Sequence, residues 1–247
     1  MKKLIFFTIL SIINCGIVAH GGTLSGLIVI LDPGHGAKDL GGITHTDKKL
    51  LVCESGYNYD VMLRLEKILS EEGAIVFKTC YSKREIINDT LGLIQPTRQA
   101  KFTLDSSMVN NTREGLNKRV LYANKIKNEN LGNRIIYLSI HFDQIPPKCY
   151  GARIIASEKN LLVNLLIKEF KINGCLSPYP DPVLISGKGF ENIYVLTPIN
   201  LIADRVLLEL GNMCNRNDLL KMRSPSGRES YAYIINSALI KYFNVNR

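Results

Sequence analysis

The sequence has no pair of cysteines at C-x-x-C spacing, which argues against a zinc ribbon. Six cysteines are present, and Cys15 lies in an apolar N-terminal run. Without Cys15 an odd number remains, so no regular disulfide framework is indicated, although one or two bridges could form in an oxidising compartment. The cysteines by themselves therefore leave the disulfide pairing open.

Arginine-rich helices and the glycine–aromatic motifs of nucleic-acid binding are also lacking. The net charge of +9 favours an anionic partner, either nucleic acid, a membrane surface or an acidic polymer. Of these, nucleic acid is the weakest choice, and we expect none to bind. With no internal repeat and no interdomain linker, a chain of 247 residues with 46% hydrophobic residues fits one globular domain.

The N-terminus has the pattern of a secretory signal peptide. A short cationic start is followed by apolar residues 4–18 and by small residues near position 22, so we expect a signal over 1–22 and a mature domain over 23–247. Export would place the protein in the periplasm or cell envelope. The run Ile12-Ile13-Asn14-Cys15 is a loosely spelled lipoprotein box, so two alternatives stay open. They are membrane attachment through a lipidated Cys15 and an uncleaved anchor.

The rest of the chain alternates between apolar runs and helical patterns. We expect strands at 26–30, 74–79, 135–140 and 151–156, helices at 57–69, 116–127, 161–170 and 231–243, and two further short apolar runs at 193–196 and 205–210. The alternation predicts an α/β domain with a twisted, mostly parallel sheet of about six strands, flanked by helices on both faces. Two segments predict loops: 177–190, rich in proline and glycine, and the polar insertion 83–113, which is long enough to suggest a functional or mobile role.

Three predicted strands end in a side chain that is costly to bury. These are His35, His141 and Glu209, and a fourth candidate, Glu54, stands just before the first helix. Because parallel strands bring their carboxyl ends to one edge of a sheet, all four could meet there. Two other histidines, His20 and His45, lie at the signal junction and in a loop, where we expect exposure to solvent.

Two imidazoles and a carboxylate suit zinc, which in catalytic sites keeps three protein ligands and an open position for water. A nearby glutamate could then serve as general base and general acid. The alternative from composition alone is that these residues are separate and individually satisfied.

Five motifs follow one another along the chain. They are Asp32-Pro33-Gly34-His35-Gly36 with Asp39 and Gly41, Glu54 before a helix, Leu116-x-x-Arg119-x-x-x-Ala123-Asn124, Ser139-Ile140-His141, and Leu207-Leu208-Glu209-Leu210-Gly211-Asn212. In this order they resemble the zinc-dependent N-acetylmuramoyl-L-alanine amidases of bacterial cell walls. The resemblance implies zinc bound by His35, Glu54 and His141, with Glu209 as catalytic acid/base. It also implies hydrolysis of the amide bond between N-acetylmuramic acid and L-alanine in peptidoglycan.

The chain departs from that family in places. Thr79-Cys80 stands where Thr-Arg is usual, Phe142-Asp143 follows His141, and the insertion 83–113 is longer than the usual link. No wall-binding repeat and no site-plugging helix can be identified, although 83–113 could cover the cleft, and a protein activator is left open. Two other functions remain: a zinc peptidase or deacetylase acting on another amide, and a non-catalytic wall-binding protein of the same fold.

Overall fold

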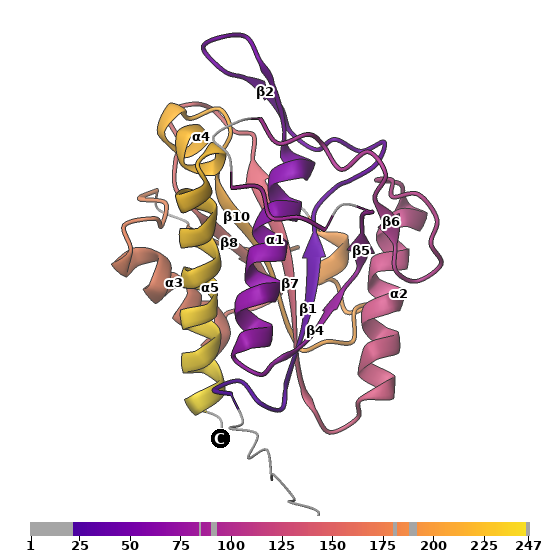
Figure 1. Ribbon diagram of the computed structural model, residues 1–247. Helices are drawn as coiled ribbons and strands as arrows, with labels where there is room; N and C mark the ends of the chain where they lie inside the picture. Colours follow the sequence, from indigo (N-terminus) through magenta and orange to yellow (C-terminus); the bar gives the residue numbers. More distant parts are fainter. Residues whose placement is uncertain (1–21, 84, 90–92, 180–181, 188–191, 246–247) are drawn as a thin grey trace, which may run out of the picture.

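The computed structural model describes residues 22–245, except 84, 90–92, 180–181 and 188–191 (Figure 1). The expected signal peptide, with Cys15 and His20, lies outside the described residues apart from Gly22. The main sheet contains β1 (Leu27–Pro33), β4 (Ile75–Lys78), β7 (Arg134–Asp143), β8 (Arg153–Ala156), β9 (Val183–Ile185) and β10 (Asp204–Asn212). The helices are α1 (Glu54–Glu71), α2 (Arg113–Glu129), α3 (Leu161–Ile172), α4 (Arg216–Arg223) and α5 (Pro225–Val245).

The six strands lie in the order β4-β1-β7-β10-β8-β9. Strands β4, β1, β7 and β10 are mutually parallel, whereas β8 runs antiparallel to β10 and β9 runs parallel to β8. The mostly parallel α/β sheet is therefore confirmed, and β1–α1–β4 is the expected unit of two parallel strands joined by a helix. Because β1, β7 and β10 are neighbours, their carboxyl ends meet at one edge.

Helices cover both faces of the sheet. On one face α1, α3 and α5 pack on alternate residues of the strands, among them Val29, Leu138 and Leu208; α1 and α5 run side by side there (Figure 1). On the other face Val120 of α2 packs with Ile30 and with the short 3₁₀ helix η1 (Tyr194–Leu196). Continuous β-branched strands such as β1 are buried on both sides, which explains why they show no alternation with polar residues.

One expectation about the C-terminal half was wrong: the strand β9 lies inside the expected loop 177–190. Three residues on a sheet edge are too short for a period to be recognised. Of the two short apolar runs, 193–196 forms η1 and 205–210 lies within β10. Helix α4 was not expected, and α5 begins at Pro225 rather than at 231, since a proline is favourable in the first turn of a helix.

The insertion after β4 is mostly irregular but packed against the rest of the fold. It pairs β5 (Cys80–Tyr81) with β6 (Lys101–Phe102), and Phe102 joins a small apolar cluster with Ala37 from the loop after β1. The backbone N–H of Ala37 also donates to the carbonyl of Thr97. The insertion therefore braces the loop that carries His35.

A hairpin of β2 (Ile43–His45) and β3 (Leu51–Cys53) interrupts the loop expected between β1 and α1, and it projects beyond the sheet (Figure 1). His45 is exposed on it, as expected. All five described cysteines are free, so none of the disulfides left open by the sequence forms among them. Across the described part of the chain, no helix is long and apolar enough to cross a membrane.

Candidate active site

His35 is held in an unusual backbone conformation just past the end of β1. Its φ of 65° lies in the left-handed region, which residues other than glycine rarely adopt. Arg119 from α2 donates through Nη2 to the carbonyl of His35 at 3.0 Å and through Nη1 to the carbonyl of Pro33 at 2.8 Å. The buried guanidinium of Arg119 therefore holds the strained turn in place. Strained backbone of this kind is common at functional sites.

Glu54, the first residue of α1, lies between the two imidazoles. Its Oε2 is 3.1 Å from Nε2 of His35, and its Oε1 is 3.1 Å from Nδ1 of His141. The same carboxylate accepts hydrogen bonds from the backbone N–H of Gly42 at 2.8 Å and of Phe142 at 3.1 Å. Each side chain offers one ligand atom, and the three atoms lie within 4.8 Å of one another, so these residues could together hold a metal ion.

Two glycines allow this close approach. A Cβ added at Gly34 would lie 2.2 Å from the ring of His141. One added at Gly41, where φ is 70°, would lie 2.6 Å from both Oε2 of Glu54 and the ring of His35. Glycines at these positions are therefore a steric requirement of the cluster.

Asp39 and Asn58 orient the cluster from outside. Oδ2 of Asp39 lies 2.8 Å from Nδ1 of His35, which leaves Nε2 of that ring to face Glu54. Asn58, one turn after Glu54 on α1, donates to Oε1 of Glu54 at 2.8 Å and to the carbonyl of Gly34 at 3.2 Å. Carboxylates that orient ligating histidines in this way are a regular feature of metal sites. Sequence reasoning missed Asn58, although its i+4 spacing from Glu54 was the available signal.

The charges of the cluster shift the pKa values of its members. Burial raises the pKa of the Glu54 carboxyl, but hydrogen bonds from His141 and His35 outweigh burial and hold the pKa well below its usual range. Burial lowers the pKa of His35, whereas its contacts with Asp39 and Glu54 raise that pKa to about 10. Because coordination requires the neutral imidazole, a metal ion would compete with this proton.

Glu209 lies beside the cluster on β10, directly paired in register with His141 on β7. Its Oε2 is buried and has no hydrogen-bond partner among the described residues. Burial, together with the negative charges of Asp143 and Glu54, raises the pKa of Glu209 well above its usual range. A carboxyl in this state is suited to proton transfer, and such perturbed groups concentrate in active sites.

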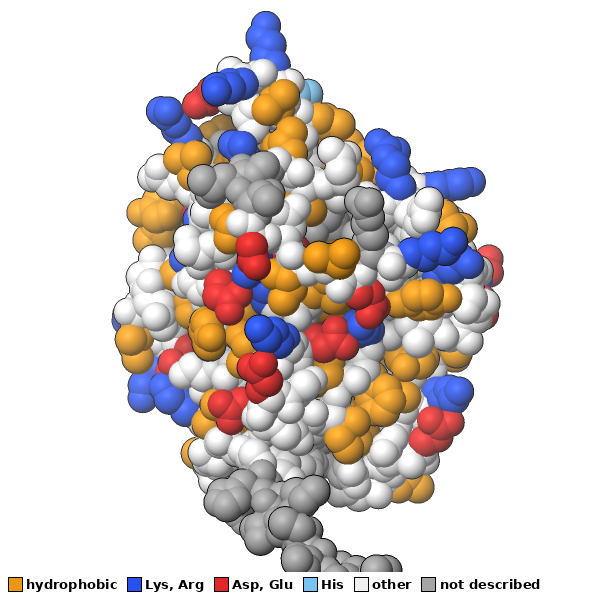
Figure 2. Space-filling model, in the orientation of Figure 1, with side chains coloured by type: hydrophobic (Ala, Val, Ile, Leu, Met, Phe, Trp, Pro, Cys, Tyr) orange, Lys and Arg blue, Asp and Glu red, His pale blue; other side chains and the backbone are white. Residues whose placement is uncertain are grey.

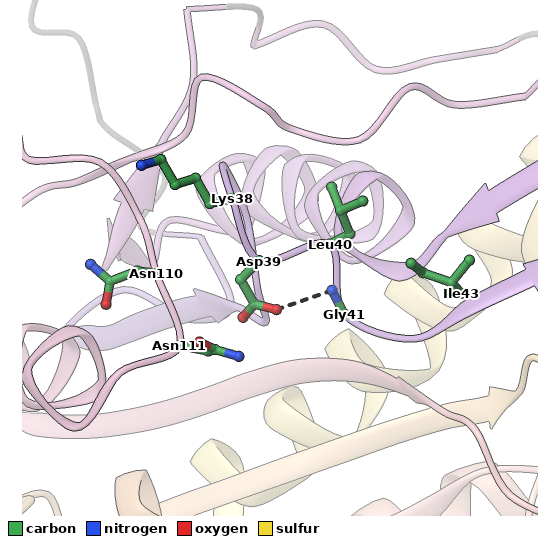
Figure 3. A pocket seen from close by; sticks show the side chains of 7 residues that line it. All are labelled: Lys38, Asp39, Leu40, Gly41, Ile43, Asn110 and Asn111. Atoms are coloured by element: carbon green, nitrogen blue, oxygen red, sulfur yellow. Dashed lines mark hydrogen bonds between the residues drawn. The ribbon is translucent and has the colours of Figure 1, made fainter.

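The cluster opens onto a cavity of about 620 Å³. The cavity is lined by His35, His141 and Glu209, by the start of α2 and by the segment 192–195. A smaller cavity of about 270 Å³ shares Asp39, Asn110 and Asn111 with it. Figure 3 shows this smaller cavity, with the N–H of Gly41 donating to Asp39. Three of the four residues expected from the sequence, His35, His141 and Glu209, thus line one cavity, and Glu54 contacts both histidines beside it.

Comparison with known proteins identifies the family. The family model described as N-acetylmuramoyl-L-alanine amidase matches residues 29–241. The chain belongs to the N-acetylmuramoyl-L-alanine amidase family. It is therefore an amidase that hydrolyses peptidoglycan, and a cell-wall amidase acts outside the cytoplasm.

Individual relatives of the amidase agree with this assignment. The germination-specific N-acetylmuramoyl-L-alanine amidase of Bacillus subtilis is 26% identical over 89% of this chain and 81% of its own length. An uncharacterized cell wall amidase of Bacillus anthracis is 25% identical over 89% of this chain but only 36% of its own length.

Solved structures share the fold of the amidase. Ami1 of Mycobacterium smegmatis has a TM-score of 0.62 at 22% identity, covering 90% of this chain and 99% of that one. CwlD of Clostridioides difficile, solved in complex with the GerS lipoprotein, has a TM-score of 0.61 at 22% identity, covering 88% and 98%.

Proposed function

We propose that the amidase binds one zinc ion through His35, Glu54 and His141, and that Glu209 is the catalytic acid/base. The cluster of three ligand atoms within 4.8 Å supports the metal site. Two imidazoles and one carboxylate match the donor set of catalytic zinc, and Asp39 supplies the usual outer partner of a ligating histidine. The residues present therefore fit the ion.

The observation that carries the role of Glu209 is its buried Oε2, which has no hydrogen-bond partner in the described part of the chain and lies on the strand position paired with His141. When bound, the ion supplies Lewis acidity that activates water and polarises the amide carbonyl. Glu209 accepts the proton of the attacking water and returns it to the nitrogen of the departing L-alanine. Its raised pKa favours the protonated form needed for the second step. The bond broken joins the lactyl carbonyl of muramic acid to the stem peptide.

The polymer substrate agrees with the surface charge. In the view of Figure 2, Lys and Arg side chains lie at the top of the molecule and along its upper left and right sides, at the end that the carboxyl edge of the sheet faces in Figure 1. Together with the net charge of +9, they suit a wall polymer that carries carboxylates or phosphates. We also propose export by a signal within 1–22, with a catalytic domain over 23–247. Membrane attachment through lipidated Cys15 is a further proposal.

A protein activator is also proposed, and the support is the CwlD structure, which was solved in complex with the GerS lipoprotein. The exposed apolar residues Ile43, Leu50 and Leu51 of the β2–β3 hairpin offer a contact surface next to the site.

The decisive experiment measures free N-terminal alanine released from purified peptidoglycan, with bound zinc measured in parallel. We expect release by the zinc-loaded protein, and loss of release with a chelator. Glu209→Gln should slow release by about 10²- to 10⁴-fold while zinc stays bound, because only the proton transfer is removed.

Matched histidine variants test the ligands. His141→Ala should lose zinc, whereas His45→Ala, at an exposed histidine on the hairpin, should keep both zinc and activity. Release of acetate or of other N-terminal amino acids instead of alanine would favour a deacetylase or a peptidase. Unchanged wall binding without any hydrolysis would favour a non-catalytic wall-binding protein.

A further inference from the structure

The cavity at the metal cluster has a second wall that takes no part in holding the cluster. It is formed by the first turn of α2, with the preceding Asn110 and Asn111, and by the segment 192–195, which leads into η1. The metal cluster marks where the scissile amide must lie. This second wall is therefore placed to contact parts of the substrate away from that bond.

The second wall carries an exposed arginine, Arg113. The guanidinium carbon of Arg113 lies 4.2 Å from the centroid of the Tyr194 ring, so the two planes form a cation–π contact. The hydroxyl of Tyr194 donates to Oδ1 of Asn117 at 3.0 Å. Asn117 lies one turn after Arg113, so a single helix holds both the guanidinium and the ring beneath it.

The chain that follows η1 is also tied to α2. Nδ2 of Asn124 donates to the carbonyl of Ile199 at 2.8 Å, and the N–H of Leu201 donates to Oδ1 of Asn124 at 2.8 Å. The guanidinium therefore rests on a platform that is already ordered. A ligand would not have to pay the entropy of ordering that wall.

Arg113 has no acidic partner among the described residues, unlike the other arginine of the cavity. Arg119 is committed to Asp32, with 2.5 Å between Nη1 and Oδ1. Asp39, an acidic residue that also lines the cavity, is committed to His35. The positive charge of Arg113 thus stays available within the catalytic cavity.

The stability of α2 does not explain this arginine. Arg113 is the first residue of the helix, where the macrodipole disfavours a cation and favours an anion. Thr112 already caps the helix by accepting from the N–H of Gly115. The position therefore points to a ligand. Among the described residues nothing accepts from the N–H groups at the edge of the stacked guanidinium, so they can form a two-pronged contact.

We propose that Arg113, on its Tyr194 platform, binds a carboxylate of the stem peptide and selects substrates that carry a free one. This inference rests on the proposed function of the site, because the stem peptide is the part of the substrate that continues beyond the amide bond. A paired guanidinium–carboxylate contact is charge-assisted and geometrically specific. Arg113 would contact the substrate without taking part in the proton transfer.

Two substrates test the selection: a muramoyl peptide whose second stem residue bears a free carboxylate, and the same peptide with that carboxylate amidated. For Arg113→Gln we expect KM on the free-carboxylate substrate to rise by about tenfold with kcat nearly unchanged, and KM on the amidated substrate to change little. Arg113→Lys should recover part of the loss. Lys125→Gln removes one exposed charge from the same helix and should leave both substrates unaffected.

Binding measured in the presence of a chelator separates this inference from the proposed function. If the wild-type protein prefers the free-carboxylate peptide and Arg113→Gln loses that preference, the inference holds even if no hydrolysis is seen. If hydrolysis occurs but both proteins treat the two peptides alike, the proposed function stands and the role of Arg113 is overturned. An equal loss on both substrates, as expected from a structural defect, would also overturn it.

Discussion

The two faces of the sheet are built differently. The face covered by α1, α3 and α5 holds a continuous apolar cluster whose members run from Leu24 to Phe243 in the sequence. The face covered by α2 has a smaller apolar cluster, which gives way near the carboxyl edge to a buried polar network. There Asp32 accepts hydrogen bonds from Arg119 and Ser139.

Apolar burial on one face and polar contacts on the other contribute differently to the stability of the fold and to the position of His35. Burying apolar side chains stabilises the fold with little directional demand. A buried ion pair such as Asp32–Arg119 contributes little net stability, because desolvation offsets its attraction, but it is directional. Here it fixes the turn that carries His35. The face covered by α1, α3 and α5 therefore carries the larger apolar core, and the face covered by α2 fixes the turn that carries His35. Glu54 and Asn58 reach the site from the first turns of α1.

Arg119→Ala should have the largest effect. It leaves the carboxylate of Asp32 buried without its ionic partner, which costs about 3–5 kcal/mol in the free energy of unfolding. It also releases the backbone at His35, so the affinity for zinc should fall by about 10- to 100-fold. Denaturant unfolding and metal titration of the folded protein measure the two effects.

The control for this prediction is Arg216→Ala, at an exposed pair with Asp47, which should change the free energy of unfolding by under about 1 kcal/mol. If Arg119→Ala destabilised the fold but left zinc affinity unchanged, the α2 face would not be positioning His35.

Leu65→Ala, on the face covered by α1, α3 and α5, should lower the free energy of unfolding without lowering the affinity for zinc. Leu65 of α1 is fully buried in the large cluster, so its truncation should cost about 3 kcal/mol in the free energy of unfolding. Zinc affinity of the folded protein should stay the same, because the apolar side chain of Leu65 makes no hydrogen bond to a proposed metal ligand. Leu121→Ala, at an exposed leucine of α2, is the matched control and should change stability by under about 0.5 kcal/mol. A fall in zinc affinity for Leu65→Ala would show that the apolar face also sets the geometry of the metal site.

The smallest effect concerns the pH dependence of stability. Burial raises the pKa of Asp32, but the charge of Arg119 and the hydrogen bonds from Thr79 and Ser139 outweigh burial and lower that pKa. Because the pKa of Asp32 is lower in the folded state than in the unfolded state, its ionised form stabilises the fold. This contribution is complete above the unfolded pKa of about 3.9 and is lost as the pH falls through the folded pKa. Stability of the wild type should therefore fall more steeply below about pH 4 than that of Asp32→Asn.

Urea unfolding midpoints between about pH 6 and pH 2 measure this difference in slope. Asp47→Asn, at an exposed aspartate, should keep the wild-type slope. Equal slopes for the wild type and Asp32→Asn would mean that Asp32 does not contribute to the acid sensitivity of the fold.

The strand-end argument predicted three members of the site because it depends on chain direction alone. His35 follows β1, His141 and Glu209 lie near the carboxyl ends of β7 and β10, and the structure brings all three to the same cavity. Glu54 was weaker as a prediction from the residues, since its place at the start of α1 depends on the β2–β3 hairpin, which the sequence did not reveal. The motifs shared with the amidase family singled it out.

The sequence by itself determined the α/β class, the central strands and the family, because hydrophobic periodicity and short motifs are local properties of the chain. Only the tertiary structure decided which partners meet over long sequence distances. Arg119 reaches His35, Asn58 reaches Gly34, and Arg113 stacks on Tyr194, in each case between separate elements. Such contacts depend on how helices pack against the sheet, and no local pattern records that packing.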